Sequence, residues 1–310
     1  MSLDLAVNSS CSDKAPKFDS GSGCIFSQDS AISYVWNAWN GRKTYTMVHA
    51  VKALLVSLEP LMFASTFVLF GDHYQLPPLV QSAEARENGM GISLFFRLSE
   101  AHPQAISPLQ SQYRMCQSIM ELSNALIYGD RLHCGSPEVA NAKLNFPRPS
   151  SCSSWLKAVL NLSRPVIFVN TDMLPAFEVR DHKTVNNPLE AYIIAEITAG
   201  LVNNGIEGND IGIITSGESP QTCLPSISGD TYYGQIPGKR QRLHTVSFVR
   251  SNENPRNCIS SLLADWQRIN VALTRAKKKL IMVGSCRTLS KVPTLKLLID
   301  KVDEQSRYFG

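Results

Sequence analysis

The sequence predicts an α/β protein whose parallel sheets carry helices on both faces. Three observations support this class. Apolar segments of strand length alternate with segments of helical period through the C-terminal half of the chain. A buried strand at 66–70 ends in a polar loop, as strands of parallel sheets do. The composition, with 44% hydrophobic and 18% charged residues among 310, indicates a globular protein rather than a disordered one.

The N-terminal part of the chain is predicted to hold a leader, a helix and this buried strand. Residues 1–35 are rich in Ser, Gly and Asp and lack periodicity, which indicates a loose leader. Residues 45–58 place apolar side chains at helical spacing. Two further helices are expected at 84–100 and 115–128.

The remainder of the chain alternates strands with helices. Residues 135–163 carry Pro, Ser and Asn, which indicates a linker or an insertion. The clearest helix begins at Pro188, with Asn187 as its N-cap, and ends at Gly205. The other expected strands are 165–171, 210–215, 245–249 and 279–285, and the other expected helices are 265–278 and 294–302.

Charge, hydropathy and cysteine usage narrow the class further. Thirty Lys and Arg against 26 Asp and Glu give a net charge of +4, which neither requires nor excludes a nucleic-acid partner. The longest apolar stretch, Leu61–Phe70, is too short to span a bilayer, and the first residues lack the features of a secretory signal. The 8 cysteines form no CxxC pair, so we expect reduced thiols rather than a zinc site or a disulfide framework.

Polar side chains follow the buried strand in the segment GDHYQLPP, residues 71–78. Pro77 and Pro78 stiffen the exit from this loop. Asp72 and Gln75 lie at the carboxyl end of the strand, where α/β sheets bind ligands. The alternative interpretation is a solvated turn without a ligand.

Two arginines stand where a cation suggests an anionic ligand. Arg114 lies in the segment QYRM ahead of a predicted helix, where a planar guanidinium suits a phosphate. Arg275 lies in VALTRAK, in an otherwise apolar helical turn. The alternatives are a plain surface arginine for Arg114 and, for Arg275, a head group that reaches solvent past apolar surface.

In this order, the three segments resemble motifs of superfamily 1 helicases. GDHYQLPPLV is similar to helicase motif III, QYRM to the motif that opens the second motor domain, and RINVALTRAKKKL to motif VI. The flanking segments LEPLMFASTFVLF, DIGIIT and VSFVRSN extend the similarity over residues 45–133 and 163–302. The chain looks most like the helicase part of the eukaryotic DNA replication ATP-dependent helicase/nucleases.

The resemblance implies an ATP-driven motor of DNA replication and repair in the nucleus. Two RecA-like P-loop NTPase domains would clamp ATP and Mg²⁺ and step along single-stranded DNA. Gln75 would sense the γ-phosphate, and Arg114 and Arg275 would reach it from the second domain as arginine fingers. Asp72 would either support the magnesium–water network or brace its loop.

The resemblance also divides the chain. It implies a leader at 1–35, a truncated first RecA-like domain at 36–134, a linker or insertion at 135–163 and a second RecA-like domain at 164–305.

The first domain departs from the family pattern in its nucleotide-binding motifs. The phosphate loop G-x-x-x-x-G-K-[ST] is reduced to Gly41-Arg42-Lys43-Thr44, so Lys43 and Thr44 are the remaining nucleotide-binding candidates. The magnesium-binding Asp-Glu pair is absent from the sequence between 45–58 and 66–70, and no metal ligand is predicted.

Two segments contain the missing motifs in another reading frame. Back-translated Trp36–Gly41, read one base later, permits Gly-Met-Pro-Gly-Thr-Gly, which restores a phosphate loop before Lys43-Thr44. The same offset from Ser228 to His244 permits Val-Glu-Ile-His-Thr-Met-Asp-Lys-Tyr-Gln-Gly-Arg-Asp-Lys-Asp-Cys-Ile. That reading supplies the Tyr-Gln-Gly motif that residues 216–245 lack in frame. The sequence thus predicts a frame-shifted, internally deleted copy of a helicase gene.

Three functions remain open at the level of sequence. The first is an ATP-dependent DNA helicase whose ATP turnover is impaired. The second is a non-catalytic remnant that binds single-stranded nucleic acid or a partner. The third is an RNA helicase of the same superfamily.

Overall fold

The computed structural model describes residues 5–8, 67–78, 80, 82–148, 151–175, 178–181, 184–215, 232–233, 242–251 and 265–308. Contacts between Cα atoms divide the chain into two compact units, Ser2–Leu109 and Gln110–Gly310. The predicted first domain ended at 134, whereas residues 110–134 group with the second unit. The physical reason is that the helix at 117–123 packs against two C-terminal helices.

The N-terminal unit contains a small antiparallel sheet in the order β2-β1-β3. Its strands are β1 (Leu5–Asn8), β2 (Val68–Leu69) and β3 (Ile106–Pro108). The sequence predicted a parallel sheet here, but these described strands pair antiparallel. The strand Leu5–Asn8 lies in the segment that was predicted to be a leader. Sequence did not reveal it, because a strand of four residues is too short for an alternation of apolar and polar residues to be recognised.

The single helix predicted at 84–100 is interrupted. The structure has α2 (Ala83–Ala85), the π-turn η2 (Arg86–Met90) and α3 (Leu94–Ala101), followed by the 3₁₀ turn η3 (Pro103–Ala105). Gly89 adopts φ +85°, which ends the first helical segment. Ser93 then starts α3 afresh, because its hydroxyl accepts a hydrogen bond from the Phe96 amide.

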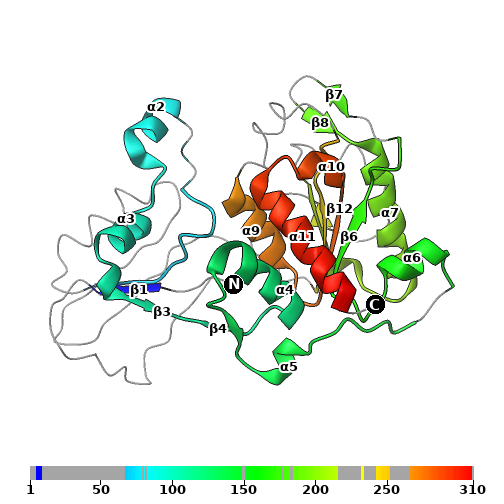
Figure 1. Ribbon diagram of the computed structural model, residues 1–310, viewed down its shortest axis with the longest axis horizontal. Helices are drawn as coiled ribbons and strands as arrows, with labels where there is room; N and C mark the ends of the chain where they lie inside the picture. The colour runs from blue at the N-terminus through cyan, green and yellow to red at the C-terminus, as the bar shows by residue number, and fades with distance from the viewer. Residues whose placement is uncertain are drawn as a thin grey trace. The chain divides into compact units, whose positions relative to one another are not determined.

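The C-terminal unit is built on a parallel sheet in the order β10-β9-β11-β12-β6 (Figure 1). The strands are β6 (Val166–Asn170), β9 (Ile211–Thr215), β10 (Tyr232–Tyr233), β11 (Leu243–Ser247) and β12 (Lys279–Gly284). All residues of β11 and β12 are buried, as expected for central strands covered on both faces. The parallel sheet predicted for this half is confirmed, with β11 beginning before its predicted start at 245.

Helices cover both faces of this sheet, with α9 and α11 on one side and α7 on the other (Figure 1). The helix α7 begins at the predicted residue, because Asn187 Oδ1 accepts a hydrogen bond from the Glu190 amide. Gly205, at φ +85°, follows its last turn as predicted. The main helices are α4 (Gln117–Ser123), continued by η4 (Asn124–Tyr128), α6 (Ser154–Val159), α7 (Pro188–Asn203), α9 (Trp266–Arg275) and α11 (Pro293–Tyr308).

Shorter elements complete the unit. They are β4 (Ser111–Gln112), β5 (His133–Cys134), α5 (Pro137–Ala140), β7 (Val179–Asp181), β8 (Thr184–Asn186), η5 (Gly208–Asp210) and α10 (Cys286–Leu289). Within the described part of the chain, no helix combines the length and the hydrophobicity that crossing a membrane requires.

The segment predicted as a linker or an insertion at 135–163 contributes to the core of this unit. Leu144, Leu156 and Leu160 are buried in the same apolar cluster as the inner face of α7. The contact is close, because a Cβ added at Gly200 would lie 2.8 Å from Leu156 Cδ2. Its Pro and Ser content concealed these well-spaced apolar anchors.

Candidate functional site

The two predicted arginine fingers converge in the C-terminal unit. Arg114 lies between β4 and α4, and Arg275 is the last residue of α9. Arg114 Nη2 donates a hydrogen bond to the Arg275 carbonyl oxygen at 3.1 Å, although the residues are 161 positions apart. The Cys116 amide donates to the Lys277 carbonyl at 2.8 Å, which ties the two segments together again. The structure therefore brings the QYRM and VALTRAK segments into one corner of the unit.

Gln112, quoted in the motif but given no role from sequence, holds the loop that carries Arg114. Its side chain is fully buried. Oε1 accepts from the amides of Arg114 and Met115 at 2.9 and 2.8 Å, and Nε2 donates to the Met115 carbonyl at 2.8 Å and to Cys134 Sγ at 3.0 Å. A buried amide with its polar atoms paired fixes a loop firmly. The only sequence signal was a polar residue directly before the arginine segment.

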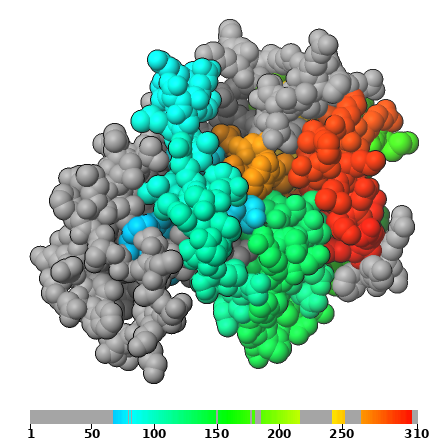
Figure 2. Space-filling view, turned by 60° about the vertical axis from the view of Figure 1, so that its left-hand side comes forward, coloured from blue at the N-terminus to red at the C-terminus, as the bar shows by residue number. Residues whose placement is uncertain are grey.

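Helix α9 positions Arg275 through both apolar and polar contacts. Asp265 caps the helix by accepting from the amides of Gln267 and Arg268. Asn270 is fully buried within the apolar face, and its Nδ2 donates to the Tyr128 hydroxyl at 3.0 Å. Figures 1 and 2 show α9 and α11 side by side on this face of the unit. The last turn of α9 is therefore held in place from two sides.

The pKa of His244, near the amino end of β11, indicates the electrostatic potential in this corner of the unit. The imidazole is fully buried, and neither ring nitrogen has a hydrogen-bond partner. The pKa of His244 is lowered to about 3, mainly by burial and in addition by the positive charges of Arg114 and Arg275. Both guanidinium groups therefore act on the same point in the molecule. The corner is cationic, which suits an anionic group such as a phosphate.

The loop with Asp72 and Gln75 lies in the N-terminal unit and forms a compact turn. Asp72 Oδ1 accepts from the Tyr74 amide at 2.9 Å, and the Gln75 amide donates to the Asp72 carbonyl at 3.1 Å. The His73 ring packs against Tyr74 and Phe96, with ring centroids 4.1 and 5.6 Å apart. Asp72 thus makes a loop-bracing contact, and its magnesium–water role stays a prediction.

The remaining candidates concern nucleotide and metal binding. Lys43 and Thr44 lie outside the described residues. Among the residues that are described, no group of three or more His, Cys, Asp or Glu is arranged to hold a metal ion.

Comparison with known proteins identifies the family. A family model described as an AAA domain matches residues 90–287, more than half of the chain. The chain belongs to the AAA domain family. This match includes Arg114 and Arg275, and it agrees with the RecA-like α/β class predicted from sequence. The predicted family resemblance and fold class are thus confirmed.

The similar curated proteins of this AAA family are replication helicase/nucleases. JHS1 of Arabidopsis thaliana, named as a DNA replication ATP-dependent helicase/nuclease, is 66% identical over 259 residues, which are 82% of this chain and 20% of that protein. DNA2 of Xenopus laevis is 41% identical (82% of this chain, 26% of that protein), and DNA2 of Homo sapiens is 39% identical (81% and 25%). The chain spans about a fifth to a quarter of the length of these relatives, so the similarity covers only that part of each of them.

Proposed function

We propose that this chain is derived from an ATP-dependent DNA helicase of superfamily 1 and that its C-terminal unit is the second motor domain. The observation that carries the proposal is the convergence of Arg114 and Arg275, tied by a 3.1 Å hydrogen bond. This domain comprises the predicted range 164–305 together with the QYRM segment and α4. The names of the relatives, DNA replication ATP-dependent helicase/nucleases, favour DNA over RNA as the bound strand.

The arginine pair supports a role in phosphoryl transfer. Arg114 and Arg275 would hold the γ-phosphate of ATP, with Gln75 as its sensor in the first domain. Negative charge on that phosphate is stabilised by guanidinium groups fixed in place before the reaction. Gln112 and α9 supply this fixing by holding the backbone of each arginine.

We also propose that ATP turnover by this chain is impaired. Gly41-Arg42-Lys43-Thr44 is all that the sequence keeps of a phosphate loop, and the Asp-Glu pair that would hold Mg²⁺ is missing. Each loss is expected to lower turnover by orders of magnitude. What remains is a domain that binds single-stranded DNA in the nucleus as part of replication and repair.

Two assays on the whole chain test the proposal. Hydrolysis of Mg-ATP is measured with and without single-stranded DNA for the unsubstituted chain, Arg275→Ala and the exposed-arginine control Arg287→Ala. Binding of labelled single-stranded DNA and RNA is measured at rising salt. We expect hydrolysis no faster than that of Arg275→Ala, and DNA binding that weakens as salt rises.

Each contrary outcome removes a specific part of the proposal. A DNA-stimulated rate well above that of Arg275→Ala contradicts the impairment and leaves the helicase assignment standing. Tighter binding of RNA than of DNA favours the RNA helicase alternative. No binding of either strand at low salt overturns the nucleic-acid function.

The departures from the family pattern have a genetic explanation that we propose with it, namely an internal deletion in the first domain and a shifted reading frame at Trp36–Gly41 and at Ser228–His244. Sequencing the transcript tests this. Uninterrupted cDNA coding WNAWNGRKT and YYGQIPGKRQ would show that these segments are translated as written, and a one-base difference at either place would confirm an error in the gene sequence.

A further inference from the structure

The carboxyl edge of the C-terminal sheet has a switch in chain direction between β9 and β11. From β9 the chain leads to β10 on one side, and from β11 it leads to β12 on the other. Open α/β sheets bind their ligands outside the carboxyl ends of two such strands. The backbone that leaves β11 therefore lines the point where this sheet would meet a ligand.

This exit from β11 has an unusual conformation. Val249 adopts φ +63°, in the left-handed region that β-branched residues rarely occupy. Such conformations persist only when the surrounding contacts determine them, and they gather at functional sites. The contacts that determine the conformation of Val249 therefore bear on the function of this loop.

Glu190 supplies the main contact, although it belongs to the first turn of α7. Its carboxylate is fully buried, and Oε2 accepts from the Ser247 hydroxyl at 2.6 Å and from the Val249 amide at 2.9 Å. Asn187 Nδ2 donates to Glu190 Oε1 and to the Val249 carbonyl, both at 3.2 Å. Both backbone polar groups of Val249 are thus held by side chains at the start of α7.

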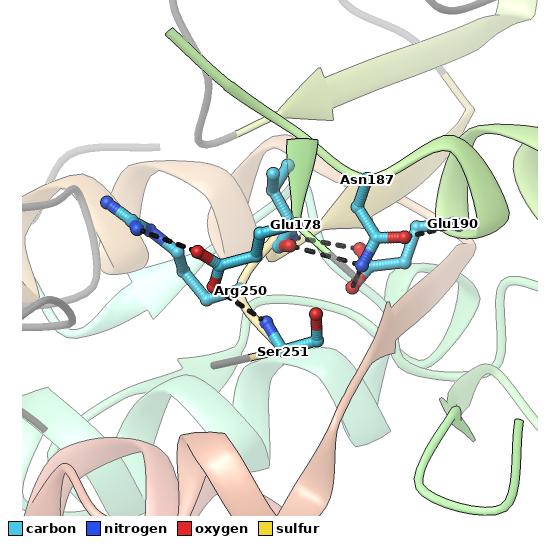
Figure 3. A network of polar contacts seen from close by, with 6 residues as sticks. Glu178, Asn187, Glu190, Arg250 and Ser251 are labelled. Carbon is cyan, nitrogen blue, oxygen red and sulfur yellow. Dashed lines mark hydrogen bonds and ion pairs between the residues drawn. The ribbon is translucent and has the colours of Figure 1, made fainter. Parts of the chain in front are cut away.

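Glu178 continues the same arrangement along the loop. It accepts from the Ser251 amide at 3.1 Å and pairs with Arg250 at 3.4 Å, and the two charged side chains are 5% and 11% exposed (Figure 3). Two carboxylates therefore fix Ser247 and residues 249–251. A glutamate at the third position of a helix normally accepts a hydrogen bond from the amide of its own N-cap residue. Glu190 instead accepts hydrogen bonds from Ser247 in β11 and from Val249 just after it.

We propose that Glu190 is a positioning residue, which holds the exit of β11 so that residues 249–251 present a fixed surface to single-stranded DNA. The proposal rests on the DNA-binding function proposed above. Glu190 itself is buried and acts through the backbone of Val249. The positive end of the α7 dipole supports its ionised form, and burial opposes it.

The titration of Glu190 provides a readout that a merely structural role would not give. The pKa of Glu190 is raised to about 7, mainly by burial; the Glu178 carboxylate also raises it, and the hydrogen bonds from Ser247 and Val249 offset part of the rise. Among the residues that the structure describes, the charged groups of this network are Glu178, before β7, and Arg250, on the exit of β11. Protonation removes an acceptor from the Glu190 carboxyl and loosens the loop.

The test measures the affinity for single-stranded DNA between pH 6 and 8 in the whole chain, for the unsubstituted protein, Glu190→Gln and the control Glu196→Gln on the same helix. We expect Glu190→Gln to bind DNA about tenfold more weakly than the unsubstituted protein at pH 8. The affinity of the unsubstituted protein should increase as the pH rises through 7, and that of Glu190→Gln should not. Glu196→Gln should follow the unsubstituted protein. Hydrogen exchange should show faster exchange of the amides of 249–251 in Glu190→Gln, with β12 unchanged.

The outcomes separate the two proposals. If Glu190→Gln binds DNA with the affinity and pH profile of the unsubstituted protein, the positioning role is wrong and the DNA-binding function stands. If the unsubstituted protein does not bind DNA, both are overturned. Should Glu190→Gln fail to fold, Ser247→Ala removes one contact and keeps the carboxylate. An unchanged affinity and pH profile in that variant would then reject the proposal.

Discussion

The buried polar side chains at the two ends of strand β11 differ in whether they have hydrogen-bond partners. At the carboxyl end, Glu190 is fully buried and accepts three hydrogen bonds. At the amino end, His244 is equally buried and both of its ring nitrogens lack a partner. His244 is the last residue of the segment that we propose is read out of frame, and the shifted reading places Ile there. A misread segment can keep an average composition while a single side chain, here His244, lacks hydrogen-bond partners in its site.

The strongest test of this contrast removes the satisfied group. Glu190→Ala leaves the donors of Ser247, Val249 and Asn187 unpaired in a buried site. We expect the free energy of unfolding to fall by about 3 kcal/mol, because a buried polar group that loses its partner retains the full cost of its desolvation. Urea unfolding followed by circular dichroism measures the change, and a loss below about 0.5 kcal/mol would contradict it.

Replacing the unsatisfied group should have the opposite sign. His244→Ile puts an apolar side chain into a fully buried position between β9 and β12. We expect the free energy of unfolding to rise by about 2 kcal/mol, because no hydrogen bond is lost and an unpaired imidazole is removed. The exposed His133→Gln serves as the control. A clear destabilisation by His244→Ile would show that the imidazole fits its site and would weaken the frame-shift explanation.

The same two groups oppose each other in their dependence on pH. His244 has a folded-state pKa of about 3 against an ordinary 6.5, so the unfolded chain binds more protons between these values and stability falls as the pH drops. Glu190 has a folded-state pKa of about 7 against 4.5, so the folded chain binds more protons and stability falls as the pH rises through this window.

Measuring the unfolding of His244→Ile and of the unsubstituted chain at several pH values isolates the contribution of His244 to the pH dependence of stability. The advantage of His244→Ile over the unsubstituted chain should widen as the pH falls from 6.5 to 4.5, by at most about 1.4 kcal/mol per pH unit. An advantage that stays constant across this window would mean that His244 keeps an ordinary pKa in the folded chain.

Local signals predicted α7 and its ends, whereas long-range contacts lay beyond the sequence. Asn187 and Gly205 act on their own backbone neighbourhood, so their residue types suffice to locate the helix. The partner of Glu190 is a strand that follows about 60 residues later, and nothing in the first turn of a helix reveals it. In the sequence, Glu190 has no feature that sets it apart from other acidic residues in the first turn of a helix.

The candidate site divides in the same way. The family resemblance, rather than spacing, predicted a shared role for Arg114 and Arg275, because residues 161 positions apart meet only through the fold. The segment 135–163 shows the limit of composition. Its Pro, Ser and Asn content indicated a linker or an insertion, and the buried side chains of Leu144 and Leu156 show that part of it packs in the core.

Lys279 offers the smallest effect and the sharpest comparison with His244. It begins β12, next to the residue that lies opposite His244, and it is also buried. The pKa of Lys279 is lowered to about 7, mainly by burial and in addition by the charge of nearby Arg164. Lys279 Nζ nevertheless donates to the carbonyls of Asn161 and Arg164 at 2.9 and 2.8 Å. The amino edge of the sheet can therefore accommodate a polar side chain when partners are present.

Lys279→Met should then destabilise the chain by about 1 kcal/mol, because the two carbonyls lose their donor while the apolar stem is kept. Urea unfolding of Lys279→Met and His244→Ile side by side measures the pair. Opposite signs would show that hydrogen-bond satisfaction, rather than burial at this edge, separates the two residues. Stabilisation by both substitutions would instead show that this edge disfavours any polar side chain, and His244 would no longer mark the misread segment.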